Sequence, residues 1–163
     1  MLKSIMALLG ASGLLLQTGA AMACTWIMPP EAAWALDADL VVEGRLVEYR
    51  PNAFDSFPRS PQYAHITLDV TAALAGEARG RVELMLPLHY APVPEEWRWG
   101  DTVIVGAFIP PYPDRQIDHP RKDLPTIITP TCAEAFIMPS SEALRSEIEV
   151  LLAEADHRMP AGY

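Results

Sequence analysis

Two cysteines are the side chains best suited to chemistry in this chain of 163 residues. Cys24 and Cys132 make an even pair, and in an oxidising compartment such a pair is most simply a disulfide. Closing a loop of about a hundred residues would add roughly 4–5 kcal/mol of stability in the chain-entropy model. Two thiols are too few soft ligands for a metal site, and paired cysteines leave no thiolate nucleophile. The sequence therefore predicts a disulfide between Cys24 and Cys132.

The other residue types that act as catalysts form no recognised pattern. Four histidines are scattered along the chain without metal-ligand spacing: His65, His89, His119 and His157. A weak hard-metal site in the loop that carries Asp114, Asp118 and His119 is the disfavoured alternative. Neither a G-x-S-x-G nucleophile elbow nor a glycine-rich phosphate loop occurs. The sequence therefore predicts a protein that is not an enzyme, with no catalytic residues, no metal and no cofactor.

Trp97 and Trp99 are the best candidates for a ligand platform. Residues two apart in a strand share one face, so the two rings could stack together against a sugar or a peptide. The same spacing suits a hydrophobic clamp around the turn at Gly100, and we favour that structural interpretation. Binding of a small ligand or glycan near Trp97 and Trp99 remains the alternative.

The first 23 residues have the features of an export signal. Lys3 supplies the positive end, an apolar run extends over residues 5–16, and Ala21-Met22-Ala23 forms a small-x-small cleavage site. The apolar run is shorter than the roughly 20 residues that cross a bilayer, which disfavours a retained membrane anchor. We therefore predict residues 1–23 as a signal peptide, a mature chain that begins at Cys24, and a periplasmic or secreted location.

The mature chain, residues 24–163, is predicted to be one domain. Its length is ordinary for a domain with a real core, and it contains no further membrane span. A lipid anchor on Cys24 is disfavoured because Ala21 and Met22 do not suit a lipidation signal. The whole chain has 21 acidic and 12 basic residues and a net charge of −9, which argues against nucleic acid and anionic membranes as partners.

The elements that must position these residues are mostly strands. Alternation of apolar and polar residues indicates strands near 39–49, 65–71, 81–86, 102–109 and 126–129. Gly44, inside the first of them, indicates a bulge or a sharp bend, which is a common way to curl a strand around a small barrel.

Helical segments are predicted at both ends of the mature chain. Pro29-Pro30 precedes a short helical turn over residues 32–36, and Trp26 and Trp34 are expected to pack this segment onto the barrel. A long helix follows Ser140 and Ser141, with an apolar stripe that faces the sheet: Leu144, Ile148, Leu151, Leu152 and Ala155. The predicted fold is mainly β, a small five-stranded OB-like Greek-key barrel with a short N-terminal helical turn and a C-terminal helix.

One stretch carries a family resemblance. Cys24-Thr25, a proline-containing segment and then Asp39-Leu40-Val41-Val42 together resemble the start of netrin-like (NTR) domains, specifically of tissue inhibitors of metalloproteases. Thinner likeness continues through residues 70–76, the strand entry at Gly100-Asp101, and Ile127-Ile128 running into Cys132. The resemblance implies an OB-like barrel closed by helices.

The resemblance also implies a mechanism. In the inhibitors, the α-amine and carbonyl of the first cysteine chelate the protease's catalytic zinc, and the next side chain enters the specificity pocket. Carried over, Cys24 would chelate the zinc and Thr25 would fill the pocket. Trp26 and Leu36 stand where the family has further cysteines, so a Cys24–Cys132 bond would be a rearranged pairing. The sequence thus predicts an exported binding module whose partner is a protein, with a zinc metalloprotease as the partner that the resemblance implies.

Overall fold

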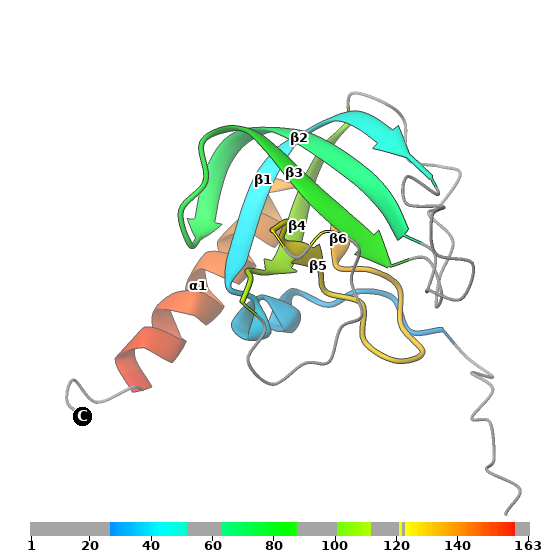
Figure 1. Cartoon of the computed structure of the whole chain (residues 1–163). Coiled ribbons are helices and arrows are strands. Elements are labelled where there is room, and N and C mark those ends of the chain that lie inside the picture. The colour runs from blue at the N-terminus through cyan, green and yellow to red at the C-terminus, as the bar shows by residue number, and fades with distance from the viewer. Residues whose placement is uncertain (1–26, 52–62, 88–100, 112–120, 122, 159–163) are drawn as a thin grey trace, which may run out of the picture.

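A closed five-stranded β-barrel forms the centre of the molecule (Figure 1). The computed structural model describes residues 27–51, 63–87, 101–111, 121 and 123–158. Their elements are η1 (Ala32–Asp37), β1 (Leu40–Arg50), β2 (Tyr63–Ala75), β3 (Gly80–Pro87), β4 (Thr102–Phe108), β5 (Thr126–Ile127), β6 (Ile137–Pro139) and α1 (Glu142–Arg158). The predicted fold class is confirmed: the chain is mainly β, with a short helical turn before the barrel and one helix after it.

The barrel strands follow the order β1-β2-β3-β5-β4, and pairing of β1 with β4 closes the ring. All pairs are antiparallel except β3 with β5, which meet in parallel at Met85 and Thr126. β6 is a sixth strand that pairs with β4, and the sequence did not predict it. Its three residues are too short a segment for alternation to be read.

β1 bends sharply around the barrel. Its register against β2 shifts between Glu43 and Gly44, which confirms the irregularity predicted at that glycine. A Cβ atom on Gly44 would lie 2.8 Å from the carbonyl oxygen of Asp69, so β1 and β2 approach too closely there for any side chain.

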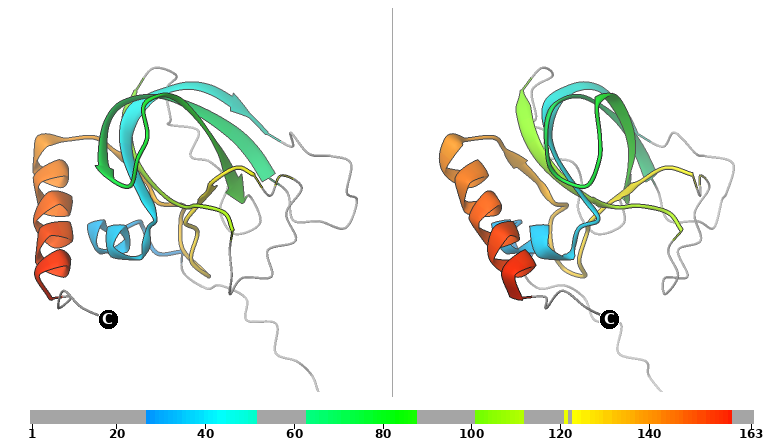
Figure 2. Two further views of the ribbon diagram at one scale, coloured as in Figure 1. Left: turned by 60° about the vertical axis from the view of Figure 1, so that its left-hand side comes forward. Right: turned by 90° about the vertical axis from the view of Figure 1, so that its left-hand side faces the viewer.

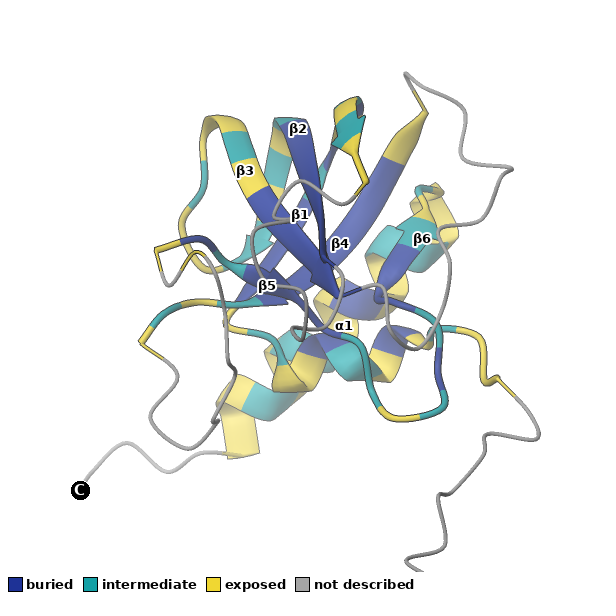
Figure 3. Cartoon of the chain, turned by 45° about the vertical axis from the view of Figure 1, so that its right-hand side comes forward, coloured by how far each residue is buried: buried dark blue, intermediate teal, exposed yellow. Residues whose placement is uncertain are grey.

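Alternate residues of the strands fill the barrel. The inward set confirms the predicted pattern on β1 and β2 and comprises Leu40, Val42, Leu46, Ala64, Ile66, Leu68, Leu84, Leu86, Val103, Val105, Ala107 and Ile127. When the chain is coloured by burial, β4 is dark along most of its length, whereas β1, β2 and β3 are dark along one part and teal or yellow along the rest (Figure 3).

A second core lies between the barrel, η1 and α1, and α1 runs along one side of the molecule with η1 next to it (Figure 2). Ile148 of α1 is fully buried there, and Trp34 of η1 meets Phe136 edge to face with ring centroids 6.3 Å apart. Leu144, Leu151 and Leu152 pack against the same core, which confirms the predicted stripe of the long helix apart from Ala155. The predicted packing of Trp34 is confirmed as well. Trp26 lies outside the described residues.

The start of α1 is fixed to β1. The Ser141 hydroxyl accepts a hydrogen bond from the Leu144 amide at 3.2 Å and so caps the helix. Ser140 donates to the half-buried Glu43 carboxylate, and Arg145 pairs with the same carboxylate at 3.4 Å. Within the described ranges, neither helix has the length and apolar character that a bilayer span requires.

Candidate functional site

Most of the predicted site residues fall outside the part of the chain that the structure describes. Cys24, Thr25, Trp97 and Trp99 belong to these segments, whereas Cys132 is described. The Cys24–Cys132 disulfide, the chelating terminus and the tryptophan platform therefore stay predictions. The described residues nevertheless define two surfaces that bear on them.

The first surface is the N-terminal edge, which we define as residues 27–30 together with residues 132–134. Met28 forms a parallel β-bridge with Ala133. The Met28 amide donates to the Cys132 carbonyl at 3.0 Å, and the Glu134 amide donates to the Met28 carbonyl at 2.9 Å. Two backbone hydrogen bonds thus hold the entering chain directly beside Cys132.

The side chains of the N-terminal edge differ in how far they are buried. Ala133 is fully buried, but Ile27 and Met28 keep 44% and 46% of their surface exposed. The fold fixes the backbone of the segment and leaves these two neighbouring apolar side chains in solvent. Adjacent exposed apolar side chains on a fixed backbone are suited to contact with another molecule.

Cys132 itself adopts an unusual backbone conformation. Its φ of 60° lies in the left-handed region, where the other positive values in the described chain belong to glycines. The Ala133 amide donates to the Pro130 carbonyl at 3.2 Å, which places Cys132 third in a tight turn. A positive φ at that place favours Gly or Asn, and a residue with a Cβ costs about 1 kcal/mol or more there. Cys132 therefore carries its side chain at a position whose backbone conformation favours Gly or Asn.

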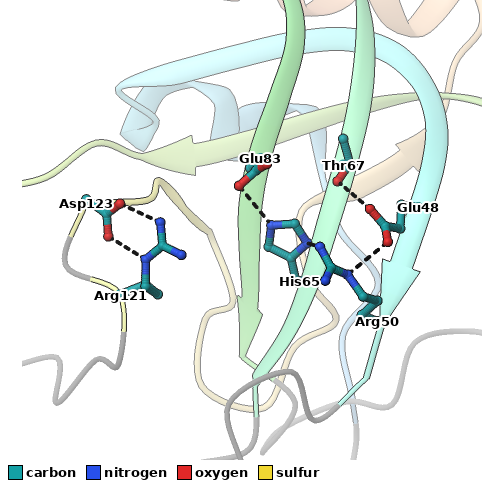
Figure 4. Close-up of polar contacts among 7 residues, drawn as sticks. All are labelled: Glu48, Arg50, His65, Thr67, Glu83, Arg121 and Asp123. Carbon is teal, nitrogen blue, oxygen red and sulfur yellow. Dashed lines mark hydrogen bonds and ion pairs between the residues drawn. The ribbon is translucent and has the colours of Figure 1, made fainter.

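The second surface is the outer-face cluster, which we define as five polar residues on the outside of the barrel. Strand β1 contributes Glu48 and Arg50, β2 contributes His65 and Thr67, and β3 contributes Glu83 (Figure 4). His65 is 5% exposed and Thr67 is 4% exposed although both point away from the barrel core.

A β-bulge in β1 brings the cluster together. Continuous alternation from Leu40 and Leu46 would point Glu48 and Arg50 into the barrel. The register shift between Leu46 and Glu48 inserts one extra residue and places Glu48 opposite Thr67 and Arg50 opposite His65. One extra residue exchanges the two faces of a strand, so both charged side chains turn outward.

His65 is the centre of the cluster. Its Nδ1 lies 3.3 Å from Nη2 of Arg50, and its Nε2 lies 3.2 Å from Oε2 of Glu83. An arginine nitrogen can only donate, so Nδ1 accepts from Arg50 and Nε2–H donates to the Glu83 carboxylate. The contacts select one neutral tautomer of the imidazole and connect β1, β2 and β3 through it.

The remaining charges around the cluster are also paired. Arg50 Nε lies 2.9 Å from a Glu48 oxygen, and the other Glu48 oxygen accepts from Thr67 at 3.5 Å. In the neighbouring loop, Arg121 and Asp123 form a bidentate pair with distances of 2.6 and 2.8 Å (Figure 4). The hydrogen bond to Asp123, with the added field of Glu83, raises the pKa of Arg121 above its ordinary value.

The chemistry available to the outer-face cluster is hydrogen bonding and charge recognition. Its described members include no thiol, and no group of three or more metal-ligating side chains occurs among the residues described. The sequence analysis did not assemble the cluster, because its contacts between strands join residues 15 to 19 positions apart and depend on the strand register. The clearest signal in the sequence was the pair of charged residues, Glu48 and Arg50, on either side of Tyr49 at the end of β1.

Neither a model of a known protein family nor a curated protein matches this sequence.

Proposed function

We propose that this protein is an exported, non-enzymatic binding module that holds a protein partner at its N-terminal edge. The observation that carries the proposal is the β-bridge between Met28 and Ala133, which fixes the backbone while Ile27 and Met28 keep nearly half of their surface exposed. A fixed segment loses less conformational entropy on binding than a free chain end would. Export, which the first 23 residues predict, would place this edge in contact with extracytoplasmic proteins.

The partner we propose is a zinc metalloprotease, with the α-amine and carbonyl of Cys24 on the zinc and Thr25 in the specificity pocket. The resemblance of the Cys24-Thr25 terminus to the inhibitor family suggests this chemistry. The position of Cys132 supports it, because Met28 pairs with Cys132 and is four residues after Cys24. Four residues span at most about 13 Å, so a disulfide between the two cysteines is within reach.

The decisive experiment measures inhibition of a panel of zinc proteases by the chain that begins at Cys24 and by the same chain with one extra N-terminal alanine. Chelation requires the free amine of Cys24, so the extension should abolish inhibition and leave folding unchanged. Intact mass with and without reduction establishes the terminus and the disulfide beforehand. If both forms inhibit equally, or neither inhibits, the chelation mechanism is wrong.

A Met28→Ser variant separates the N-terminal edge from the chelating terminus. It removes an exposed apolar side chain without changing Cys24, so it should weaken partner binding while the protein remains folded. Binding that survives the alanine extension but fails in Met28→Ser would support the edge as a protein-binding surface without zinc chelation.

The second candidate function is binding of a small ligand or glycan on the outer face of the barrel. The outer-face cluster favours it, because Glu48, Arg50 and Glu83 present both acceptors and donors from three adjacent strands. OB-type barrels commonly bind ligands on the face formed by these strands. Tryptophan fluorescence titration with glycans and small acids tests it, with Trp97→Ala, Trp99→Ala and Glu83→Ala as the variants expected to lose the response. A response that none of the three variants changes would exclude this face.

A further inference from the structure

Strand β3 has an edge that β5 covers at one end. β3 pairs with β2 from Gly80 to Pro87, but the bridge to β5 is at Met85 (Figure 1). The Met85 amide donates to the Pro125 carbonyl on the β5 side at 2.9 Å. Successive residues of a strand direct their N–H and C=O groups to opposite edges. Arg81 and Glu83 therefore direct their backbone groups to the same side as Met85.

Within the described part of the chain, these backbone groups have no strand partner. No hydrogen bond from another described residue reaches the backbone of Arg81 or Glu83 on this edge. Gly80, Arg81 and Glu83 are exposed, and a Cβ atom built on Gly80 would meet nothing within 4 Å. An open strand edge of this kind is a template for another strand.

We propose that this edge pairs with β3 of a second copy of this chain, antiparallel and about a two-fold axis at Val82. Arg81 then lies opposite Glu83 of the second copy, and Glu83 opposite Arg81 of the second copy. Both pairs join residues whose backbone groups face the edge, and Val82 meets Val82 between them. The alternation of hydrogen-bonded and non-hydrogen-bonded pairs in an antiparallel ladder is thus satisfied.

Charge selects this register. An axis at Arg81 or at Glu83 would put identical charges directly opposite each other, which destabilises a strand pair. An axis between two residues would oppose backbone groups that point in different directions. Existing ion pairs hold the two side chains on the outer face, with Arg81 3.1 Å from Asp69 and Glu83 3.2 Å from His65.

The length of the free edge also fits a two-fold pairing. Residues 80–84 match themselves in reverse around Val82, and β5 begins to cover the edge at Met85. Gly76 and Gly80 have φ values of 70° and 67°, so the partner's chain turns away toward its own β2 before it would reach β5. This pairing is independent of the proposed function at the N-terminal edge.

Sedimentation velocity over a range of concentrations tests the proposal with two charge reversals, Arg81→Glu and Glu83→Arg. The unmodified chain should dimerise, and each variant by itself should dissociate about tenfold more readily or further, because two opposite-charge pairs become like-charge pairs. An equimolar mixture of the two variants should dimerise again, since acidic residues 81 and 83 then face basic residues 83 and 81. Circular dichroism confirms that each variant is folded.

Amide exchange gives a second measurement on the unmodified chain. Protection of the Arg81 and Glu83 amides should rise with protein concentration, whereas the Val82 and Leu84 amides, which bond to β2, provide the internal control. A monomer at every concentration, or a dimer that neither charge reversal weakens, overturns the proposal. If the chain is monomeric at every concentration, the partner to test next on the free edge of β3 is an extended segment of a different protein.

Discussion

The N-terminal edge and the outer-face cluster distribute polar and apolar side chains in opposite ways. At the edge, Ile27 and Met28 are exposed while the backbone is paired with residues 132–134. In the cluster, His65 and Thr67 are buried although they lie outside the barrel core. Apolar surface in solvent and polar surface out of solvent are both costly arrangements.

The two surfaces differ in whether contacts within the fold compensate for these unfavourable arrangements. The polar side chains of the outer-face cluster are satisfied by one another, and no buried side-chain nitrogen or oxygen among the described residues lacks a hydrogen-bond partner. Such a network holds three strands in register and needs no ligand to be stable. The exposed side chains of the N-terminal edge receive no such compensation within the fold. We therefore expect the edge to be the principal binding surface.

The largest expected effect comes from removing the support of the N-terminal edge. Phe136 is fully buried, and its carbonyl accepts from the Gly106 amide at 3.1 Å. Phe136→Ala leaves a cavity beside Trp34 and should lower the free energy of unfolding by about 3–5 kcal/mol, measured by urea denaturation. It should also speed amide exchange at Glu134, because the segment that pairs with Met28 loses its anchor.

Ile66→Ala is the matched control, since Ile66 is equally buried but lies in the barrel core. It should lower the free energy of unfolding by about 2–5 kcal/mol. The Glu134 amide, which bonds to Met28, should nevertheless stay protected from exchange until the whole protein unfolds. If both variants release the Glu134 amide equally, the edge is not supported by Phe136 in particular.

The second effect concerns the outer-face cluster. His65→Ala removes a buried ring and its two hydrogen bonds, and it should lower the free energy of unfolding by about 1–3 kcal/mol. The partners Arg50 and Glu83 are partly exposed and can be hydrated, which keeps the loss below that of Phe136→Ala. Glu83→Gln retains an acceptor for His65 Nε2–H and should cost clearly less. If His65→Ala leaves the free energy of unfolding unchanged, the network does not stabilise the fold.

Much of the fold could be predicted because its determinants are local. Alternation identified β1 to β4, Gly44 marked a bend, and Ser141 with the stripe at Ile148 located the long helix. Local signals were weaker at the extremities of the strands. β2 extends from Tyr63 to Ala75, beyond the predicted residues 65–71, because neighbours on β1 and β3 continue to pair with it.

Less of the candidate site could be predicted from the sequence, because the site depends on which distant residues pair with each other in the fold. Glu48 and Arg50 follow the inward positions of β1 in simple alternation, and the bulge after Leu46 moves them outward. The pairing of Met28 with Ala133 joins residues more than a hundred positions apart. Neither the bulge position nor this long-range contact has a signature in residue type.

A smaller effect tests the claim that the fold does not use the apolar side chains of the N-terminal edge. The double variant Ile27→Ser with Met28→Ser should lower the free energy of unfolding by only about 1 kcal/mol, because nearly half of each side chain is already exposed. Partner capture should nevertheless fall. A large loss of stability by urea denaturation would show that the side chains belong to the folded core and would remove the basis for a binding surface there.

The smallest expected effect concerns Asp69, which forms an exposed ion pair next to the buried residues of the outer-face cluster. Hydrogen bonding from Arg81 holds the pKa of the Asp69 carboxyl below its ordinary value of 3.8. A carboxyl whose pKa is lowered by folding stabilises the protein above the unfolded pKa and loses that contribution as pH falls through the folded pKa. The melting temperatures of the unmodified chain and Asp69→Asn should therefore differ slightly at neutral pH and converge in acid below 3.8. Exposed pairs are screened, so added salt should shrink the neutral-pH difference, whereas the loss in His65→Ala should persist in salt. If neither acid nor salt reduces the difference in melting temperature between the unmodified chain and Asp69→Asn, Asp69 acts through packing rather than charge.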